Sequence, residues 1–223
     1  MENKFHLTKE QSLFLIKKKW DENIYCGMHM ECRNITFPQT QTILKGINVP
    51  NVRLDDIQAV LNMRDAWKYL INNLDEDISI EYASKLNYFV ARNEALEWGV
   101  LRTGSVGISG TDFIPPVPKY ENVKDELYKI LYSTYYSDIS ETEIAIDIFL
   151  WGIKTQLFWD GNKRTSLLLA NRILLDCGCG MLTIKEKHME QFTELLTEYF
   201  NTGKNIEIKK FLYDNAIDGI KFD

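Results

Sequence analysis

The sequence has no excess of basic residues. Its 223 residues include 26 lysines and arginines against 32 aspartates and glutamates, which gives a formal net charge of −6 at pH 7. Proteins that bind duplex DNA or RNA need a basic face to neutralise the phosphates. We therefore expect no nucleic-acid partner, and we interpret the one dense basic run near the start, Lys17–Lys19, as a solvated helix face.

The sequence also lacks a long apolar run. The most apolar stretch, Ile144–Ile153, is interrupted by Asp147 and is far shorter than the roughly 20 residues that a membrane-spanning helix needs. No apolar segment follows Met1–Lys4, so no signal peptide is visible. These absences predict a soluble, cytoplasmic protein with no membrane partner.

Cysteine is scarce, with four residues in the chain. A cytoplasmic chain of this size needs no disulfide framework, so free thiols are expected. A zinc site is an alternative, because Cys26, His29 and Cys32 could meet Cys177 and Cys179, and these residue types bind zinc. Their spacing matches none of the usual zinc patterns, so free thiols are the preferred interpretation.

The composition that remains is that of an ordinary globular protein, with 45% hydrophobic and 26% charged residues. This balance supplies enough apolar material for a buried core. The length suits one domain, or one domain with an appended lobe. We expect an N-terminal helix and an irregular lead-in segment over residues 1–50, followed by a core domain over residues 51–223.

Helical patterns dominate the chain. Thr8 and Gln11 form a capping-box pattern, which predicts a helix that runs towards Tyr25. Residues 28–50 look irregular, because prolines and a glycine interrupt them. Further helices are expected from about 55 to the low seventies, over about 79–98 and 122–136, after the capping patterns at Ser140 and Thr183, and over 163–175.

The stretch 101–118 breaks this helical pattern. Val106 and Ile108 alternate with small residues, three glycines lie between 104 and 110, and three prolines close the stretch. This pattern predicts a short extended hairpin rather than a helix. The predicted fold class is therefore all-α with one short β-hairpin.

The most informative segment is Gln156–Arg164. A tight polar turn, Asp160–Asn162, runs straight into a helix that is apolar nearly all round, which is typical of a buried central helix. A helix N-terminus presents unpaired amides and the positive end of the helix dipole, and both attract phosphate. Gly161 lets the backbone approach a ligand closely. Lys163 and Arg164 add positive charge, and the guanidinium can grip phosphate oxygens as a fork.

Phosphate binding is one interpretation of this segment, and helix capping is another. In the second, Asn162 caps the helix, Gly161 makes the turn, and Lys163 and Arg164 are ordinary surface charge. Asp160 is then a turn residue. In the first, Asp160 is a magnesium ligand, because magnesium usually takes one or two carboxylates together with substrate phosphates.

The segment resembles the motif of the Fic/Doc (Fido) family, His-x-Phe-x-(Asp/Glu)-Gly-Asn-(Gly/Lys)-Arg, which lies between two helices. Phe158 and the run Asp160–Arg164 match this pattern in order. The stretch 102–110, with the prolines after it, resembles the flap hairpin of the family. The likeness covers about residues 28–200 and implies a helical bundle with one β-hairpin flap.

This resemblance implies that the motif binds Mg2+ and ATP, or another nucleoside triphosphate. By position in the motif, Asp160 would hold the metal. Gly161, Asn162 and Lys163 would line the anion pocket, and Arg164 would bind the outer phosphates.

The resemblance also implies a target protein as a partner. Val106, Gly107 and Ile108 would line an exposed strand edge, where a segment of the target adds as an extra strand; a structural cover over the core is the plainer alternative. In the family, this alignment sets a target hydroxyl against a nucleotide phosphate, and the typical reaction transfers AMP from ATP (AMPylation). Members with lysine at the position of Lys163 include the Doc kinase, which transfers the terminal phosphate instead.

The main departure from the family is Gln156, which stands where the family has its catalytic histidine. A histidine there acts as general base, whereas a carboxamide is not basic near neutral pH. Loss of a general base costs roughly a hundred- to ten-thousand-fold in rate. Phosphoryl-type transfer nevertheless depends heavily on positioning and electrostatics. His29 is the nearest replacement base on family topology, although a surface or core histidine is the plainer interpretation.

Two further departures concern the second arginine and the inhibitory glutamate of the family. Leu167 stands where nucleotidyl-transferring members often carry the second arginine, which favours the Doc-like end of the family. The inhibitory sequence survives only as Glu31, whose usual partner is that arginine. We therefore expect no inhibitory switch, and we interpret Glu31 as a surface or capping residue.

Three functions stay open. The first is a divergent transferase that moves a nucleotidyl or phosphoryl group to a protein hydroxyl, with Gln156 orienting the nucleophile. The second is a pseudoenzyme that binds a nucleotide or a partner protein and acts as a regulator. The third is a structural domain, which the retention of Asp160, Asn162 and Arg164 argues against. The sequence does not identify the target, the nucleotide base, the oligomeric state or an antitoxin partner.

Overall fold

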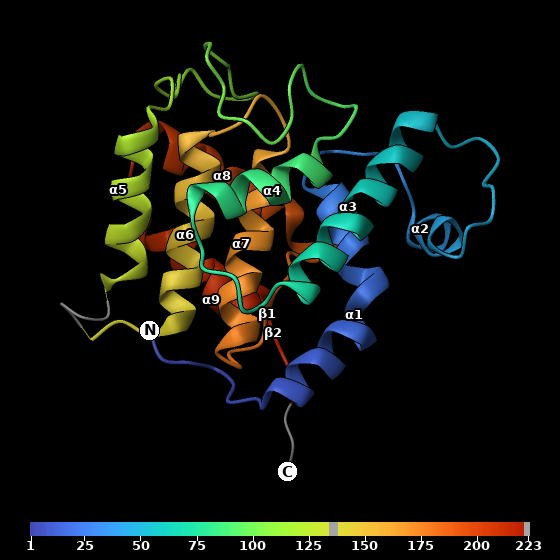
Figure 1. The fold of residues 1–223 in the computed structure, drawn as a ribbon, viewed down its shortest axis with the longest axis horizontal. Helices are drawn as coiled ribbons and strands as arrows, with labels where there is room; N and C mark the ends of the chain where they lie inside the picture. The colour runs from blue at the N-terminus through green and yellow to red at the C-terminus, as the bar shows by residue number, and fades with distance from the viewer. Residues whose placement is uncertain (134–137, 221–223) are drawn as a thin grey trace.

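The computed structural model of the chain describes residues 1–133 and 138–220, which form a helical bundle with one two-stranded antiparallel sheet (Figure 1). The all-α fold class is confirmed. The elements are α1 (Lys9–His29), α2 (Phe37–Leu44), α3 (Leu54–Asn72), α4 (Ile80–Val90), α5 (Tyr120–Leu131), α6 (Glu141–Thr155), α7 (Asn162–Asp176), β1 (Met181–Leu182), the 3-10 helix η2 (Glu186–His188), α8 (Met189–Thr202), α9 (Ile206–Ala216) and β2 (Ile217–Asp218).

The helix α7 is the centre of the bundle. All of its residues but Lys163 and Asp176 are buried, and it contacts α1, α3, α4 and α6. The approach of α6 is close enough that a Cβ on Gly152 would overlap the hydroxyl of Ser166. The apolar pattern of residues 163–175 therefore corresponds to a helix covered on every side, as the sequence predicts.

The two ends of α7 have different surroundings. Figure 1 shows α6 and α7 side by side, with their connection at the end of the bundle that the 91–119 segment crosses. At the other end, β1 pairs with β2, and the Leu7 amide donates to the Gly178 carbonyl at 2.8 Å. The candidate motif therefore lies at the opposite end of α7 from this contact between sequence-distant segments.

One apolar cluster extends through the described residues. It includes Leu15 and Ile24 of α1 as well as Phe211 of α9, so helices from both parts of the chain share it. The predicted division into a lead-in segment over residues 1–50 and a core domain over residues 51–223 stays a prediction. Among the helices that the structure describes, none combines the length and the apolar composition needed to cross a bilayer.

The lead-in segment contains a helix that the sequence analysis missed. Residues 37–44 form α2, which begins with a capping box between Thr36 and Gln39 and has Pro38 in its first turn. Proline is favoured at the start of a helix because its missing amide has no partner to lose there. The same capping pattern correctly predicts the start of α1 at Lys9, after Thr8.

The helix predicted over 79–98 is shorter than expected and ends at Val90. The side-chain amide of Asn62 donates to the carbonyl oxygens of Val90 at 3.5 Å and of Arg92 at 2.7 Å. Asn93 then takes a left-handed conformation with a φ of 63°. The side-chain amide of Asn62 thus takes the place of the backbone amides that another turn of α4 would supply. No local sequence pattern indicates this contact.

Two other expectations need correction. The helix predicted over 122–136 is α5, which starts at Tyr120 and ends at Leu131, and the predicted end at Tyr136 lies outside the described residues. Thr183 does not cap a helix, because its hydroxyl donates to the side chain of Asn23. The helix α8 begins only after η2.

The segment 101–118, named the flap from here on, contains no paired strand, so the predicted hairpin is wrong. The buried guanidinium of Arg102 donates to the carbonyl oxygens of Gly104 at 2.6 Å, Pro115 at 3.2 Å and Pro116 at 2.6 Å. Prolines have no amide to donate to a strand ladder. One side chain therefore holds the two arms of the flap together in place of backbone pairing.

Candidate functional site

The loop between α6 and α7 is built on two left-handed residues. Gln156 ends α6 with a φ of 49°, and Gly161 precedes α7 with a φ of 73°. A Cβ on Gly161 would lie 2.7 Å from Cγ1 of Val90, so glycine is required by both conformation and space. Phe158 between them is buried and fixes the loop to the core.

Side-chain hydrogen bonds close this loop from within. The Asn162 carboxamide accepts from the Phe158 amide at 2.8 Å and donates to the Phe158 carbonyl at 2.8 Å. It also donates to Oε1 of Gln156 at 3.0 Å, while Nε2 of Gln156 donates to the Ile153 carbonyl at 2.7 Å. The oxygen and the nitrogen of the Gln156 carboxamide are therefore both engaged in hydrogen bonds within the loop.

The first amides of α7 have no such partners. The first intrahelical bond runs from the Thr165 amide to the Gly161 carbonyl at 2.8 Å. Within the described part of the chain, the amides of Asn162, Lys163 and Arg164 have no hydrogen-bond acceptor. Free amides at the positive end of a helix attract anions, so this helix start keeps the feature on which the predicted phosphate site depends.

A cavity of about 480 Å³ is lined by Asp160 and Arg164, one on each side of the first residues of α7. Its volume lies within the range of small-molecule sites. Three arginines and three carboxylates are among its lining residues, so its charges are closely balanced. The lining residues are Glu31, Cys32, Arg33, Asn34, Arg53, Asp56, Asp160 and Arg164.

Arg164 is almost completely buried and already has two carboxylate partners. Its terminal nitrogens lie 3.2 and 3.3 Å from the carboxylate of Glu94, and its Nε lies 3.5 Å from Glu31. Burial opposes the charge of this guanidinium, but Glu31 and Glu94 outweigh burial and raise the pKa of Arg164. Arg164 is therefore a permanent cation with internal counter-ions.

Glu94 is a member of the site that the sequence analysis missed. Its side chain is 6% exposed and accepts from Arg33 at 2.5 Å and from the Asn62 amide at 2.9 Å, as well as from Arg164. These partners come from the lead-in segment, α3 and α7. No local pattern around Glu94 indicates them, because they are brought together only by the fold.

Asp160 fits the role of a magnesium ligand that acts together with phosphates. Its Oδ1 accepts from the Gly161 amide at 2.5 Å, and the described residues offer no hydrogen-bond donor to its other oxygen. Asp160 lines the same cavity as Arg164. One carboxylate beside a phosphate site suits magnesium, which keeps several waters and takes the rest of its ligands from the nucleotide.

The alternative zinc site is not formed. Across residues 1–133 and 138–220, no group of three or more His, Cys, Asp or Glu side chains is placed to hold a metal ion. Cys26 and Cys179 are buried, whereas Cys32 and Cys177 are exposed, and all four are free thiols as expected.

The flap is fastened directly to the motif loop. Arg102 donates from Nε to the Gln156 carbonyl at 2.6 Å, and its amide donates to the Leu157 carbonyl at 3.0 Å. Gly104 faces Trp159 so closely that a Cβ on Gly104 would lie 2.6 Å from the indole ring. The flap and the motif loop therefore form one connected surface.

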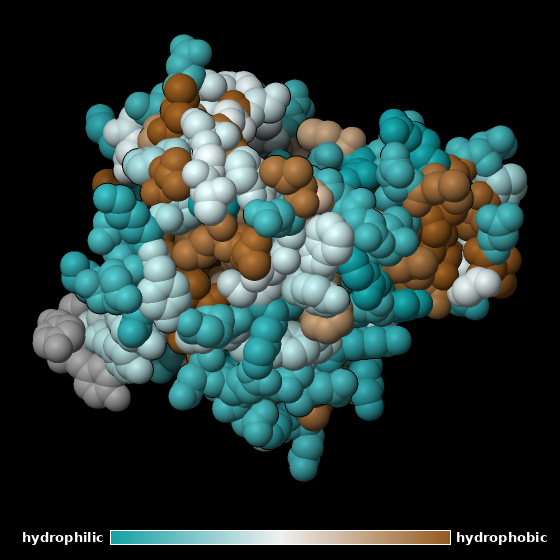
Figure 2. All heavy atoms as spheres, turned by 45° about the horizontal axis from the view of Figure 1, so that its top comes forward, coloured by the Kyte–Doolittle hydropathy of each residue, from teal (hydrophilic) through white to brown (hydrophobic). Residues whose placement is uncertain are grey.

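The predicted docking residues lie on this flap but not in a strand. Val106 and Ile108 are half-buried, and Gly107 is exposed. Figure 2 turns this end of the molecule towards the viewer and shows apolar side chains gathered on it. The exposed apolar residues of the flap and of the segment before it are Leu96, Val100, Ile114 and Val117.

Comparison with known proteins finds similarity to Fic proteins in sequence and in fold. The protein adenylyltransferase Fic of Drosophila willistoni is 25% identical to the chain over 203 residues, which are 89% of this chain. Fic-1 from C. elegans has the same fold, with a TM-score of 0.80, 22% identity and coverage of 94% of this chain and 64% of that one. The chain is thus similar to Fic proteins in sequence and shares the fold of Fic-domain proteins.

The Fic/Doc similarity covers most of this chain but only part of its relatives. The matched region is 40% of the Drosophila protein, so the chain spans less than half the length of that curated relative. BepC from Bartonella tribocorum, solved with bound AMPPNP, has a TM-score of 0.51 and 17% identity, over 72% of this chain and 86% of that one. No protein-family model matches the chain.

His29, the candidate replacement for the histidine of the motif, is held in other contacts. Nε2 of His29 lies 3.1 Å from the Ile35 carbonyl oxygen, and its ring packs against Tyr25 with 4.4 Å between centroids. In the part of the chain that the structure describes, every side-chain hydrogen bond of Gln156 goes to Ile153 or Asn162. His29 is thus a structural residue of α1.

Glu31, at the position of the inhibitory glutamate of Fic proteins, contacts the motif itself. Leu167, which stands where the family often has the arginine partner of this glutamate, is buried. The interpretation of Glu31 as a surface or capping residue is wrong, however. Its carboxylate lies 3.1 Å from Lys163 and 3.5 Å from Arg164, and Lys163 also donates to the Met30 carbonyl at 2.7 Å. Glu31 therefore occupies the mouth of the anion pocket.

Proposed function

We propose that the chain binds a nucleoside triphosphate together with Mg2+ and acts mainly as a nucleotide-binding regulatory module. The observation that carries this proposal is the set of free amides of Asn162–Arg164 at the start of α7, next to a cavity that Asp160 and Arg164 line. The AMPPNP bound to BepC, a protein of the same fold, supports a nucleotide as the ligand.

The charges of the cavity make magnesium part of the proposal. Arginines and carboxylates balance one another among the lining residues, so a bare triphosphate gains little from the pocket as a whole. A Mg2+ ion carried by the phosphates and held by Asp160 removes much of the ligand's negative charge. Binding should therefore be strongly magnesium-dependent.

The state of Gln156 argues for binding rather than rapid turnover. Both the oxygen and the nitrogen of its carboxamide are hydrogen-bonded to neighbouring residues, and a carboxamide has no basic nitrogen to accept a proton. The amides, the metal ligand and the cavity do not depend on a base at that position. A site with these parts can bind and position a nucleotide while the proton transfer of a typical family member is missing.

A second candidate function is slow transfer of a nucleotidyl or phosphoryl group to a protein hydroxyl. It is favoured by the adenylyltransferase name of the matched relatives and by the apolar surface at the flap, where a target protein can dock. In this case Gln156 orients the hydroxyl and catalysis depends on positioning and electrostatics. Val106, Gly107 and Ile108 would then contact the target.

Calorimetry of the purified chain with ATP distinguishes these proposals from a purely structural motif. We expect binding with Mg2+ and at least tenfold weaker binding with EDTA, and the Asp160→Asn variant should lose most of this difference, because it removes the metal-binding charge. Absence of binding under both conditions would sink the nucleotide proposal. Incubation with lysate and ATP labelled at the α- or γ-phosphate then separates a binding module from a slow transferase.

Removing the charge of Glu31 should strengthen nucleotide binding. The Glu31→Gln variant keeps the size of the side chain but frees Lys163 and Arg164 from a carboxylate at the pocket mouth. We expect the affinity for Mg-ATP to rise about three- to tenfold, since a partly exposed pair is worth about 1 kcal/mol. Glu10→Gln is the matched control, because Glu10 is an exposed residue of α1 and does not line the cavity. Weaker binding by Glu31→Gln would instead make Glu31 a ligand-holding group.

A further inference from the structure

A second cavity, distinct from the motif, lies on the outer side of α1. Its volume is about 930 Å³, and it opens between α1, the start of α2 and the connection from β1 to η2. We call it the lysine groove. The groove is lined by Lys17, Lys18, Lys19, Trp20, Asp21, Glu22, Tyr25, Cys26, Phe37, Gln41, Lys185, Glu186 and Lys187.

The groove carries positive charge that its own carboxylates do not neutralise. Five lysines line it against three carboxylates, on a chain with a net charge of −6. Lys19 and Lys185 share the carboxylate of Asp218, at 3.4 and 3.1 Å. In the described part of the chain, Lys17, Lys18 and Lys187 have no ion-pair partner.

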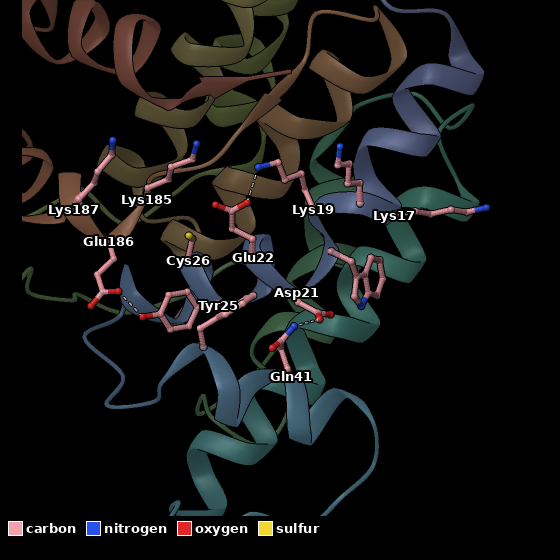
Figure 3. A pocket seen from close by; sticks show the side chains of 13 residues that line it. Lys17, Lys19, Asp21, Glu22, Tyr25, Cys26, Gln41, Lys185, Glu186 and Lys187 are labelled. Carbon is pink, nitrogen blue, oxygen red and sulfur yellow. Dashed lines mark hydrogen bonds and ion pairs between the residues drawn. The ribbon is translucent and has the colours of Figure 1, made fainter. Parts of the chain in front are cut away.

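The carboxylates of the groove are held in other interactions. Lys19 pairs with Glu22 at 2.8 Å, and the Tyr25 hydroxyl donates to Glu186 at 2.6 Å. Asp21 accepts from Gln41 at 2.9 Å. Figure 3 shows these contacts, with Lys187 and Lys17 at opposite ends of the groove. The uncommitted charge therefore lies at the two ends of an elongated surface.

The middle of the groove is apolar and aromatic. Trp20, Tyr25 and Phe37 form its walls, and the buried Cys26 lies at its base. Burial, with the nearby carboxylates, raises the pKa of Cys26 to about 12, so this thiol stays neutral and apolar. The indole N–H of Trp20 has no hydrogen-bond acceptor among the described residues. An aromatic centre between charged ends resembles the anchoring surfaces of protein interfaces.

We propose that the lysine groove binds an acidic peptide segment of a partner protein, with an aromatic or aliphatic side chain of the segment seated against Trp20, Tyr25 and Phe37. Carboxylates of the segment pair with Lys17 and Lys18 at one end and with Lys187 at the other. The side chains of a peptide differ from position to position. A peptide can therefore carry carboxylates at the two ends of the groove and neutral side chains opposite the groove residues Asp21, Glu22 and Glu186.

A nucleic acid fits this surface less well. Its phosphates are evenly spaced, so they would meet Asp21, Glu22 and Glu186 as well as the lysines. The groove has no arginine to grip phosphate oxygens in a fork. Charge complementarity thus favours the peptide over an oligonucleotide.

Fluorescence polarisation with a labelled peptide tests the proposal. The probe is a short peptide in which glutamate alternates with phenylalanine and leucine. We expect the triple variant Lys17→Glu, Lys18→Glu, Lys187→Glu to lose at least tenfold in affinity, because each exposed charge contributes a few tenths to about 1 kcal/mol and reversal adds repulsion. Trp20→Ala should also weaken binding, with little effect on its salt dependence.

The control variant reverses three exposed lysines outside the groove. Lys68→Glu, Lys129→Glu and Lys204→Glu change the net charge by the same amount and should leave peptide binding within about twofold, since distant exposed charges are screened. Circular dichroism checks that both triple variants are folded. Equal losses in the two variants, or equal binding of a peptide with glutamine in place of glutamate, would overturn the proposal. So would tighter, groove-dependent binding of a single-stranded oligonucleotide.

Discussion

Replacing Gln156 with histidine should give the chain a transfer activity that the natural sequence has at most weakly. A general base at this position is worth roughly a hundred- to ten-thousand-fold in rate. The left-handed conformation of Gln156, with a φ of 49°, is one that histidine tolerates better than most residues. The measurement is the initial rate of label transfer from ATP, labelled at the α- or γ-phosphate, to lysate proteins.

A matched variant separates basicity from a change in loop shape. Gln156→Asn keeps a carboxamide and accepts the left-handed backbone, but it supplies no base, so it should show no gain. The labelled phosphate distinguishes AMP transfer from phosphorylation. If Gln156→His binds Mg-ATP but transfers nothing, the scaffold lacks more than the base, and Leu167, at the position of the second arginine, is the first place to look.

Replacing Arg102 with methionine should strongly destabilise the fold. The guanidinium donates to the carbonyl oxygens of Gly104, Pro115, Pro116 and Gln156 from a position that is 1% exposed. Methionine fills similar space but leaves these oxygens without donors, each at about 1–3 kcal/mol. Removal of a desolvated charge offsets part of the loss, so we expect a net decrease of about 3–5 kcal/mol in the free energy of unfolding.

Urea unfolding measures this loss, and a second arginine provides its control. Arg53→Met removes a side chain that is 79% exposed and pairs with the exposed Asp55, so stability should change by less than about 0.5 kcal/mol. Proteolysis of the flap should become faster in Arg102→Met before global unfolding, because Arg102 is what joins the two arms. A change below 1 kcal/mol would mean that water replaces the guanidinium without penalty.

The motif could be predicted from the sequence because its parts are contiguous. Six matching residues between 158 and 164 predict a turn and a helix start, and the structure places both there; the phosphate site stays a prediction. The same is true of α1, whose start is encoded in Thr8 and Gln11. Local chemistry of this kind needs no knowledge of distant residues.

The missed features all depend on contacts between distant segments. Glu94 becomes part of the site only when α3, α7 and the lead-in segment converge on it. The flap was predicted as a hairpin because alternation and glycines suggest strands, yet one arginine supplies the donors that pairing would have supplied. The early end of α4 has the same cause, since Asn62 competes for its last carbonyls.

The contact between sequence-distant segments at the far end of α7 has a consequence for the order in which the chain folds. The hairpin of α6 and α7 needs only neighbouring residues, so it can form quickly. The bond between Leu7 and Gly178 and the pairing of β1 with β2 close much longer loops. Loop closure of that length is entropically costly and comes late. During synthesis, the face of α6 that contacts α9 therefore stays uncovered until residues near 216 have left the ribosome, and this interval is when the chain is most open to aggregation and to chaperones.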